Sequence, residues 1–291
     1  MTNTNESRKQ KIVKILAVIV AAGLLGAGIY IVHNLNHETT DDAYIEGRVH
    51  TIAPKVSGTV LKVYVEDNQL VKKGDLLVEI DPVDYALKVN EAMANLEVRK
   101  ATLEQSVRDR DRAESLFNGK VIPKEKHEFA LTAFNLAKAQ LSAAEQQLNI
   151  SRQNLQYTKI YSPVDGYVTK KSVEIGNQIK AEQPLMAIIG FNDMWLTANY
   201  KETQLKNVKN GQRVFVKVDT YPGKVFMGRV DSIMAGTGAA FSLFPPENAL
   251  GNYVKVVQRI PVKIIFDKNT EQDYVLRIGM SCVSTIITRN E

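Results

Sequence analysis

The 291-residue chain has one cysteine, one tryptophan and four histidines, and its net charge is only +5. With Cys282 alone, no intrachain disulfide can form, so the stability of the fold has to come from packing. Cys282 lies in the alternating stretch MSCVSTIIT, a pattern that predicts a buried strand residue rather than a reactive thiol. Because charges of both signs are spread along the chain, we expect no concentrated basic surface and no nucleic-acid binding.

Histidine is too scarce and too scattered to predict a metal site. His33 and His37 are four residues apart and could share one face of a helix, but no third ligand is near them, and His50 and His127 are isolated. The sequence also lacks a phosphate-binding glycine loop, a nucleophile elbow and a metal motif. We therefore predict no cofactor, no metal and no enzymatic activity.

One long apolar run is present, at residues 15–32, ILAVIVAAGLLGAGIYIV. At about 1.5 Å per residue it nearly spans a ~30 Å hydrocarbon core, so it predicts a transmembrane helix. The basic tail 1–14 precedes it and acidic residues follow it, which places the tail in the cytoplasm and the rest of the chain across the membrane. A cleaved signal peptide is the alternative, but the small residues Ala27 and Gly28 lie inside the apolar run, which favours a retained anchor.

A repeat organises the next part of the chain, because residues 52–80 recur in degraded form as residues 160–188 at a constant offset of 108. Two copies are too few for a solenoid, so we predict two strand-rich half-domains, 50–82 and 158–190, that pair with each other. Glycines are expected to form structural turns in these halves and in the C-terminal region, namely Gly58, Gly74, Gly166, Gly176 and Gly279.

Between the two halves, residues 83–157 have helical composition. A heptad seam runs through the second part, and a weaker one through the first, where Lys100 interrupts it and Arg110 ends it. Gly119 is expected to close the first helix as a left-handed residue, and Pro123 suits the first turn of the second helix. The predicted seam residues are Phe134, Ala137, Leu141, Ala144, Leu148, Ser151 and Leu155 in the second helix, and Val89, Met93, Leu96, Leu103 and Val107 in the first.

Residues 191–291 contain many short alternating segments separated by turn signals, which predicts a small β-barrel. Residues 33–49 are expected to provide a linker and the first barrel strand. Within the barrel region, residues 235–257 read as a long loop that is too apolar for a solvated linker. Phe241, Ser242, Leu243 and Phe244 are its candidate contact residues, either for a transporter or for a neighbouring subunit; the alternative is that the two phenylalanines plug the end of the barrel.

These segments, in this order, resemble the membrane fusion proteins, or periplasmic adaptors, of the HlyD/EmrA family. The resemblance covers essentially the whole chain, and the stretches TDDAYIEG (40–47), YKETQL (200–205) and 236–262 are similar to its EmrA type. It implies a mixed α and β fold: an N-terminal transmembrane helix, a lipoyl- or biotinyl-like β-sandwich split by an α-helical coiled-coil hairpin, and a C-terminal β-barrel. Longer adaptors add a membrane-proximal domain after the barrel, and we expect none here.

The same resemblance implies the function. We expect a single-pass inner-membrane protein, periplasmic for most of its length, that links a major-facilitator-type transporter to a TolC-like outer-membrane channel in a multidrug efflux pump. A homo-oligomer, trimeric or hexameric, is expected. The alternative is an adaptor for an ABC-driven system that secretes a polypeptide or an envelope component.

A rival function follows from the lipoyl-like halves, since a carrier domain would present a modified lysine where they join. Here Asp81-Pro82 leads into the helical insert instead, which favours a connector. In related adaptors three positions at the hairpin tip contact the outer-membrane channel. The resemblance assigns them to Arg112, Leu116 and Pro123, although proline replaces the family's serine at the third; the alternative is that Leu116 only caps the seam.

Overall fold

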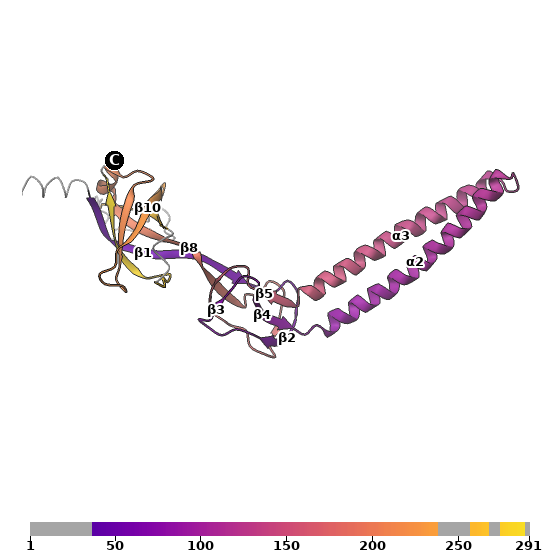
Figure 1. The fold of residues 1–291 in the computed structure, drawn as a ribbon, viewed down its shortest axis with the longest axis horizontal. Coiled ribbons are helices and arrows are strands. Elements are labelled where there is room, and N and C mark those ends of the chain that lie inside the picture. The colour runs from indigo at the N-terminus through magenta and orange to yellow at the C-terminus, as the bar shows by residue number, and fades with distance from the viewer. Residues whose placement is uncertain (1–36, 238–256, 268–273, 289–291) are drawn as a thin grey trace, which may run out of the picture. The chain divides into compact units, whose positions relative to one another are not determined.

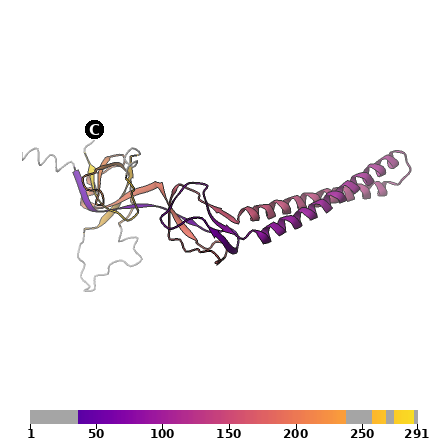
Figure 2. The same ribbon diagram turned by 60° about the horizontal axis from the view of Figure 1, so that its bottom comes forward.

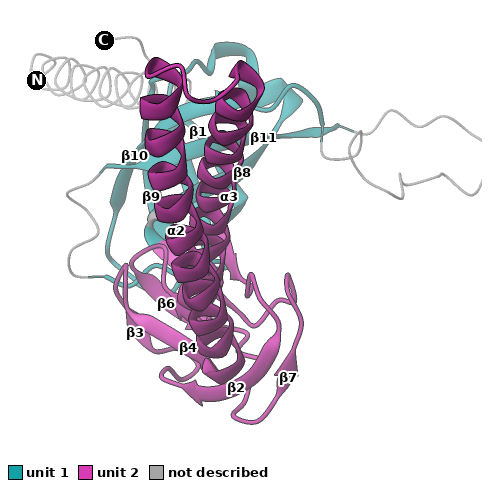
Figure 3. Ribbon diagram, turned by 90° about the vertical axis from the view of Figure 1, so that its right-hand side faces the viewer, with its two compact units in different colours: residues 1–48, 191–291 teal, residues 49–190 magenta. Residues whose placement is uncertain are grey.

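The computed structural model describes residues 37–237, 257–267 and 274–288. These form two compact units, one made of residues 37–48 with the described residues from 191 onward, the other of residues 49–190 (Figure 3). No helix among the described residues is both long enough and apolar enough to cross a membrane. The predicted anchor at residues 15–32 and the candidate contacts Phe241, Ser242, Leu243 and Phe244 lie outside the described residues.

Strands precede and follow one helical hairpin (Figure 1). The elements are, in chain order, β1 (His37–Ile52), β2 (Gly58–Val63), β3 (Leu70–Val71), β4 (Leu76–Ile80), α2 (Val83–Asn118), α3 (Lys124–Gln156), β5 (Lys159–Tyr161), β6 (Gly166–Thr169), β7 (Gln178–Ile179), β8 (Met186–Lys201), the 3-10 helix η1 (Glu202–Asn207), β9 (Arg213–Val218), β10 (Phe226–Ile233), β11 (Arg259–Phe266) and β12 (Ser281–Ile287).

The first unit is a barrel of six antiparallel strands. Its strand order is β1-β12-β9-β10-β11-β8, and a further pairing of β1 with β8 closes it. Alternation directs one side of each strand inward, as in β9, where Val214, Val216 and Val218 are buried. Tyr200 and Phe226 are the largest fully buried side chains of this core. Burial of a closed apolar interior therefore accounts for the barrel predicted from the alternating segments.

Strands of the second unit recur at the repeat distance of 108 residues. β6 and β7 begin 108 residues after β2 and β3. The hydrogen bonds also exchange between the halves: the amide of Val60 donates to the carbonyl of Asn177 at 2.9 Å, and the amide of Val168 donates to that of Gln69 at 3.0 Å. Each half thus completes the other by the same contact, which confirms one lipoyl-like domain built from two paired halves.

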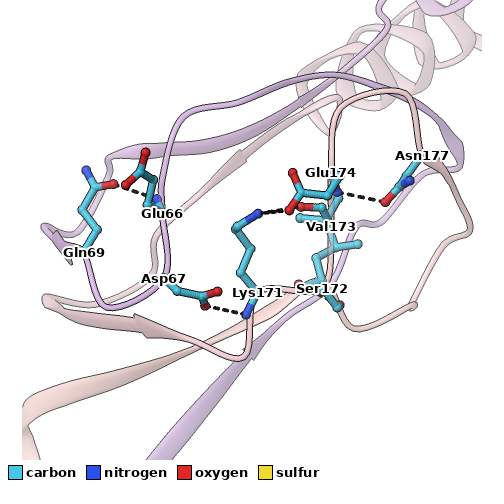
Figure 4. Close-up of polar contacts among 9 residues, drawn as sticks. Glu66, Asp67, Gln69, Lys171, Ser172, Val173, Glu174 and Asn177 are labelled. Carbon is cyan, nitrogen blue, oxygen red and sulfur yellow. Dashed lines mark hydrogen bonds and ion pairs between the residues drawn. The ribbon is translucent and has the colours of Figure 1, made fainter.

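The turns repeat as closely as the strands. Figure 4 shows the amide of Glu66 donating to Oε1 of Gln69 at 2.8 Å, and the amide of Glu174 donating to Oδ1 of Asn177 at 2.9 Å. The two pairs are related by the offset of 108. The oxygen of each side-chain amide accepts from a turn N–H that has no ladder partner, which is why a residue with a side-chain amide recurs at this position.

Left-handed backbone occurs at matching positions of the two halves, but glycine occupies only one member of each pair. Gly74 (φ 92°) corresponds to Glu182 (φ 66°), and Gly176 (φ 84°) corresponds to Asn68 (φ 64°). Gly279, in the turn before β12, has a φ of 87°. Turn geometry, rather than residue type, is therefore what the two halves share.

Gly58 and Gly166 are equivalent in the repeat and serve close packing instead of turn formation. A Cβ on Gly166 would lie 2.2 Å from the carbonyl oxygen of Ile189, and one on Gly58 would lie 2.5 Å from Cγ2 of Ile80. Neither distance is compatible with a side chain unless a neighbour moves. The first glycine of each half is thus required by the approach of its own sheet partner.

The second unit also contains the helical hairpin, in which α2 and α3 run side by side (Figures 1 and 2). The 36 residues of α2 correspond to a length of about 54 Å. Oδ1 of Asp81 accepts a hydrogen bond from the amide of Val83 at 3.0 Å, which forms an Asx-type turn around Pro82, the N-cap residue of α2, at the junction where a carrier domain would present its lysine.

The seam of the hairpin differs from the predicted one in α2. Ala92 is buried and Met93 is exposed, so the expected register was wrong at this step. Arg110 does not end the seam but lies within it. Small residues and the stems of two arginines, Arg99 and Arg110, occupy part of the space against α3 between the larger apolar side chains. Large apolar side chains at every seam position would hold the two helices further apart. The α2 residues that recur at four-three spacing and are buried or half-buried are Tyr85, Val89, Ala92, Leu96, Arg99, Leu103, Ser106, Arg110, Ala113 and Phe117.

Candidate functional site at the hairpin tip

The chain reverses at the hairpin tip through a Schellman motif at the end of α2. The amide of Val121 donates to the carbonyl of Leu116 at 2.8 Å, and the amide of Lys120 donates to that of Phe117 at 2.9 Å. Lys120 has the left-handed conformation, with a φ of 57°, whereas Gly119 has a φ of −78°. The prediction that Gly119 would be the left-handed residue was therefore wrong by one position, because α2 continues through Asn118.

The three residues assigned to channel contact all lie at this tip. Arg112 and Leu116 are one helical turn apart on α2, both exposed, and Arg112 forms an ion pair with Asp109 at 3.5 Å. Pro123 is exposed and directly precedes α3 in an extended conformation, as its N-cap residue. The arrangement offers an apolar side chain and a guanidinium to a partner surface.

Two further exposed apolar residues near the tip were missed in the sequence. Val121, in the tip loop, is 69% exposed, and Phe129, in the second turn of α3, is 78% exposed. Between them, the rings of Phe117 and His127 stack with centroids 4.9 Å apart, which joins the two helices just below the loop. Phe129 could have been found by reading the seven-residue spacing of α3 on a second face.

Residues of the TDDAYIEG stretch form a polar cluster in the barrel. Asp42 of β1 is ion-paired with Arg259 of β11 and accepts a hydrogen bond from Nδ2 of Asn199 of β8 at 3.1 Å. The hydroxyl of Thr40 donates to the carbonyl of Asn199 at 2.8 Å. These contacts tie β1 to β8, the pairing that closes the barrel, so the acidic residue has a structural role here.

Glu46 makes a second polar link across the same pair of strands. Its carboxylate accepts hydrogen bonds from Nε1 of Trp195 at 3.1 Å and from the hydroxyl of Thr197 at 2.6 Å. The Nζ of Lys263 lies 4.7 Å from the centre of the Trp195 ring. The chain's one tryptophan is therefore held between an acid and a base on the barrel surface.

Nothing in the described part of the chain is arranged for catalysis or for metal binding. No group of three or more His, Cys, Asp or Glu side chains gathers there in a way that could hold an ion. Burial raises the pKa of the Tyr200 hydroxyl and of the Cys282 thiol, so both groups stay protonated and uncharged at neutral pH. Both side chains belong to the buried core of the barrel.

Comparison with known proteins agrees with this architecture. Residues 48–190 match the family of the RND MFP barrel-sandwich hybrid domain, and residues 193–240 match the CusB-like β-barrel domain. The solved structure of the membrane fusion protein Spr0693 from Streptococcus pneumoniae R6 superposes with a TM-score of 0.65 at 15% identity, over 87% of this chain and 99% of that one. This likeness shows the fold.

Two curated relatives extend over nearly the whole chain. The multidrug export protein EmrA of Escherichia coli is 37% identical over 90% of this chain and 80% of its own length. The fatty acid resistance protein FarA of Neisseria gonorrhoeae is 33% identical over 99% of this chain and 85% of its own length. With the split lipoyl-like domain, the hairpin and the barrel in place, the chain belongs to the EmrA-like membrane fusion proteins, the non-enzymatic periplasmic adaptors of efflux pumps.

Proposed function

We propose that this adaptor connects an inner-membrane transporter of the major-facilitator type to an outer-membrane channel, and that its hairpin tip makes the channel contact. The observation that carries the proposal is the tip itself: a helix pair about 54 Å long ends in an exposed arginine and exposed apolar side chains. Exposed apolar groups at the end of a rigid element are typical of a docking surface. Arg112, Leu116 and Pro123 are the proposed contact residues.

The proposed cargo is hydrophobic and toxic to the cell. The printed names of EmrA and FarA describe multidrug export and fatty acid resistance, respectively. Both descriptions fit apolar or amphipathic compounds that partition into membranes. The adaptor need not select among them, since selection can belong to the transporter.

One charged substitution, at Leu116, tests the proposed channel contact of the tip. We expect Leu116→Asp to abolish export of a test drug while leaving membrane expression and the helical circular dichroism signal unchanged, because a carboxylate would be buried in the channel contact without a partner. Leu87→Asp is the matched control, since Leu87 is an exposed leucine near the base of α2. Normal export by Leu116→Asp would remove the tip from the mechanism.

For the stretch Phe241, Ser242, Leu243 and Phe244 we propose a contact with the transporter or with a neighbouring subunit. The support is its sequence: three large apolar residues occur within four positions of the connection between β10 and β11. Replacing both phenylalanines with serine should weaken recovery of the transporter in a pull-down while preserving the melting temperature. A fall in melting temperature with recovery unchanged would instead assign them to the barrel interior.

The alternative, an ABC-driven secretion adaptor, is distinguished by the protein that accompanies this chain in the inner membrane. Purifying the tagged full chain from membranes in mild detergent and identifying the co-purifying transporter decides between the two classes. An ATP-binding partner would overturn the choice of a major-facilitator transporter.

A further inference from the structure

A cavity of about 420 Å³ opens between the two helices of the hairpin, near the start of α2 and the end of α3. Its volume lies within the range of small-molecule sites, roughly 300–1,000 Å³. Ala92 and Ser151 are its two buried lining residues, and the side-chain amides of Asn95, Gln147 and Asn154 also line it. The lining is therefore polar, in contrast to the apolar side chains exposed at the tip.

The heptad register explains why the cavity is there. Arg99 of α2 reaches across the hairpin, and its Nη1 donates to Oε1 of Gln140 of α3 at 3.2 Å. One heptad closer to the base, the equivalent residues are Ala92 and Gln147. A methyl group cannot span the distance that an arginine spans. This level of the hairpin is therefore open, and the side-chain amide of Gln147 has no hydrogen-bond partner on the described helix α2.

Ser151 is the residue of the cavity that points most clearly to a ligand. It is only 7% exposed, yet its hydroxyl, which keeps access to the cavity, has no hydrogen-bond partner in the described part of the chain. Four other hydroxyls of the hairpin donate to the carbonyl four residues earlier, namely those of Thr102, Ser106, Ser115 and Thr132. Neither packing nor helix propensity favours serine here, because the same heptad row has Ala137 and Ala144 and alanine is the better helix former.

The two charges that line the cavity have opposite signs. Lys88 and Glu91 form no ion pair with each other or with any other described residue. The Nζ of Lys88 lies 5.5 Å from the centre of the Tyr85 ring, and the hydroxyl of Tyr85 donates to the carbonyl of Ser57 at 2.7 Å. A lining with no net charge disfavours a strongly ionic ligand. Among the described lining residues only Ala92 is aliphatic, which disfavours the hydrophobic compounds proposed as cargo.

We propose that this cavity binds a neutral sugar that carries acetamido groups, either as a soluble oligosaccharide or as a unit of a larger glycan in the periplasm. A side-chain amide both donates and accepts, so Asn95, Gln147 and Asn154 can pair with hydroxyl and acetamido groups. The hydroxyl of Ser151 gains its missing partner, and the Tyr85 ring offers an apolar surface to the C–H groups of the sugar. The site goes beyond the proposed function, because neither export nor channel contact requires it.

Saturation-transfer NMR tests the site with a defined probe, di-N-acetylchitobiose, added to the full chain in lipid nanodiscs. Nanodiscs are used because a glycoside detergent would add a sugar of its own. We expect a signal from the acetamido methyl groups of the probe and a several-fold weaker signal from cellobiose, the same disaccharide with hydroxyls in place of the acetamido groups. The readout needs no transport, so it is independent of the proposed channel contact.

Two pairs of substitutions locate the bound probe. Gln147→Ala is expected to weaken binding about tenfold, because one polar contact of the sugar is lost. Gln146→Ala, next to it and outside the lining, should leave binding unchanged.

Ser151→Ala should also weaken binding several-fold, whereas its melting temperature should stay the same or rise, since the hydroxyl has no protein partner to lose. Ser142→Ala, an exposed serine of α3 outside the cavity, is its matched control. A serine with a purely structural role would lose stability and keep binding.

Each outcome decides the proposal. Weaker binding by Gln147→Ala and Ser151→Ala, with an unchanged helical circular dichroism signal, supports the site. No signal from the probe, equal signals from the two disaccharides, or equal binding by the wild type and both variants would overturn it. If the site holds, co-sedimentation with an insoluble acetamido glycan assigns the ligand to a polymer, and its absence assigns it to a soluble oligosaccharide.

Discussion

The guanidinium of Arg110 lies over the ring of Phe134, with its carbon 4.3 Å from the ring centre. The two residues belong to different helices of the hairpin, and both occupy seam positions. The methylene groups of an arginine can cover apolar surface while its planar guanidinium stacks on the ring. A charged residue can therefore occupy a seam position of the heptad pattern, where leucine is expected. The seam therefore continues to the tip without a break at residue 110.

The first prediction concerns this contact. Arg110→Glu should destabilise the hairpin by about 1–2 kcal/mol, because it removes the cation from the ring and leaves a carboxylate facing apolar surface. Arg108→Glu, on the exposed side of the same helix, should have a much smaller effect. Thermal unfolding followed by helical circular dichroism measures both. Equal effects of the two variants would show that the stack contributes nothing.

The second prediction compares the equivalent glycines of the two halves. Gly166→Ala should cost about 2–3 kcal/mol of unfolding free energy, because the new methyl group would meet a backbone carbonyl. Gly58→Ala should cost about 1 kcal/mol, since the group in its way is a side-chain methyl of Ile80 that can shift. Urea unfolding gives both values, and the reverse order would mean that the backbone at Ile189 moves more easily than the packed side chain of Ile80.

The third prediction concerns the buried polar pair of the barrel core. The hydroxyl of Tyr200 donates to Oγ of the fully buried Ser284 at 2.8 Å. Tyr200→Phe and Ser284→Ala should each cost about 1–3 kcal/mol, because each leaves the other hydroxyl buried without a partner. The double variant should cost less than the sum of the two, and a double-mutant cycle by urea unfolding measures the difference. Strict additivity would contradict the coupling.

The fourth prediction concerns Cys282. Burial raises the pKa of its thiol from 9.0 to about 12, so the folded chain should not react with iodoacetamide at pH 8, whereas the unfolded chain should. The unfolded thiol loses its proton first as the pH rises, so this residue's contribution to stability is intact below about pH 9 and declines between about pH 9 and 12. In Cys282→Ala that part of the alkaline decline should be missing. Rapid labelling of the folded wild type would contradict the burial.

Features that follow from a strict sequence repeat were predicted well. The offset of 108 residues predicted two paired halves, and the exchange of hydrogen bonds between Val60 and Asn177 and between Val168 and Gln69 confirms it. Register within a helix was predicted less well. Ala92 and Met93 are adjacent, and hydrophobicity alone favours the methionine, whereas the closeness of the two helices selects the smaller residue.

The proposed contact residues at the tip illustrate the same limit. Arg112 and Leu116 were assigned by resemblance, and they lie at the tip. Phe129 was missed because only the face through Phe134 was interpreted as a seam, although the seven-residue spacing of Phe129, Leu136 and Ile150 is present in the sequence. The sequence predicted Phe134 in the seam with α2, and the structure places Phe129 on another face of α3, where it is 78% exposed.

The sequence by itself determined the order of the parts, namely a half-domain, a helical hairpin, the second half-domain and a barrel, since each has its own periodicity and composition. Only the tertiary structure decided which face of each helix is covered, which residue takes the left-handed conformation at the tip, and that Asp42 and Arg259 meet across the barrel strands. Local patterns determine local conformation, whereas coverage and long-range pairing depend on which surfaces fit together in space.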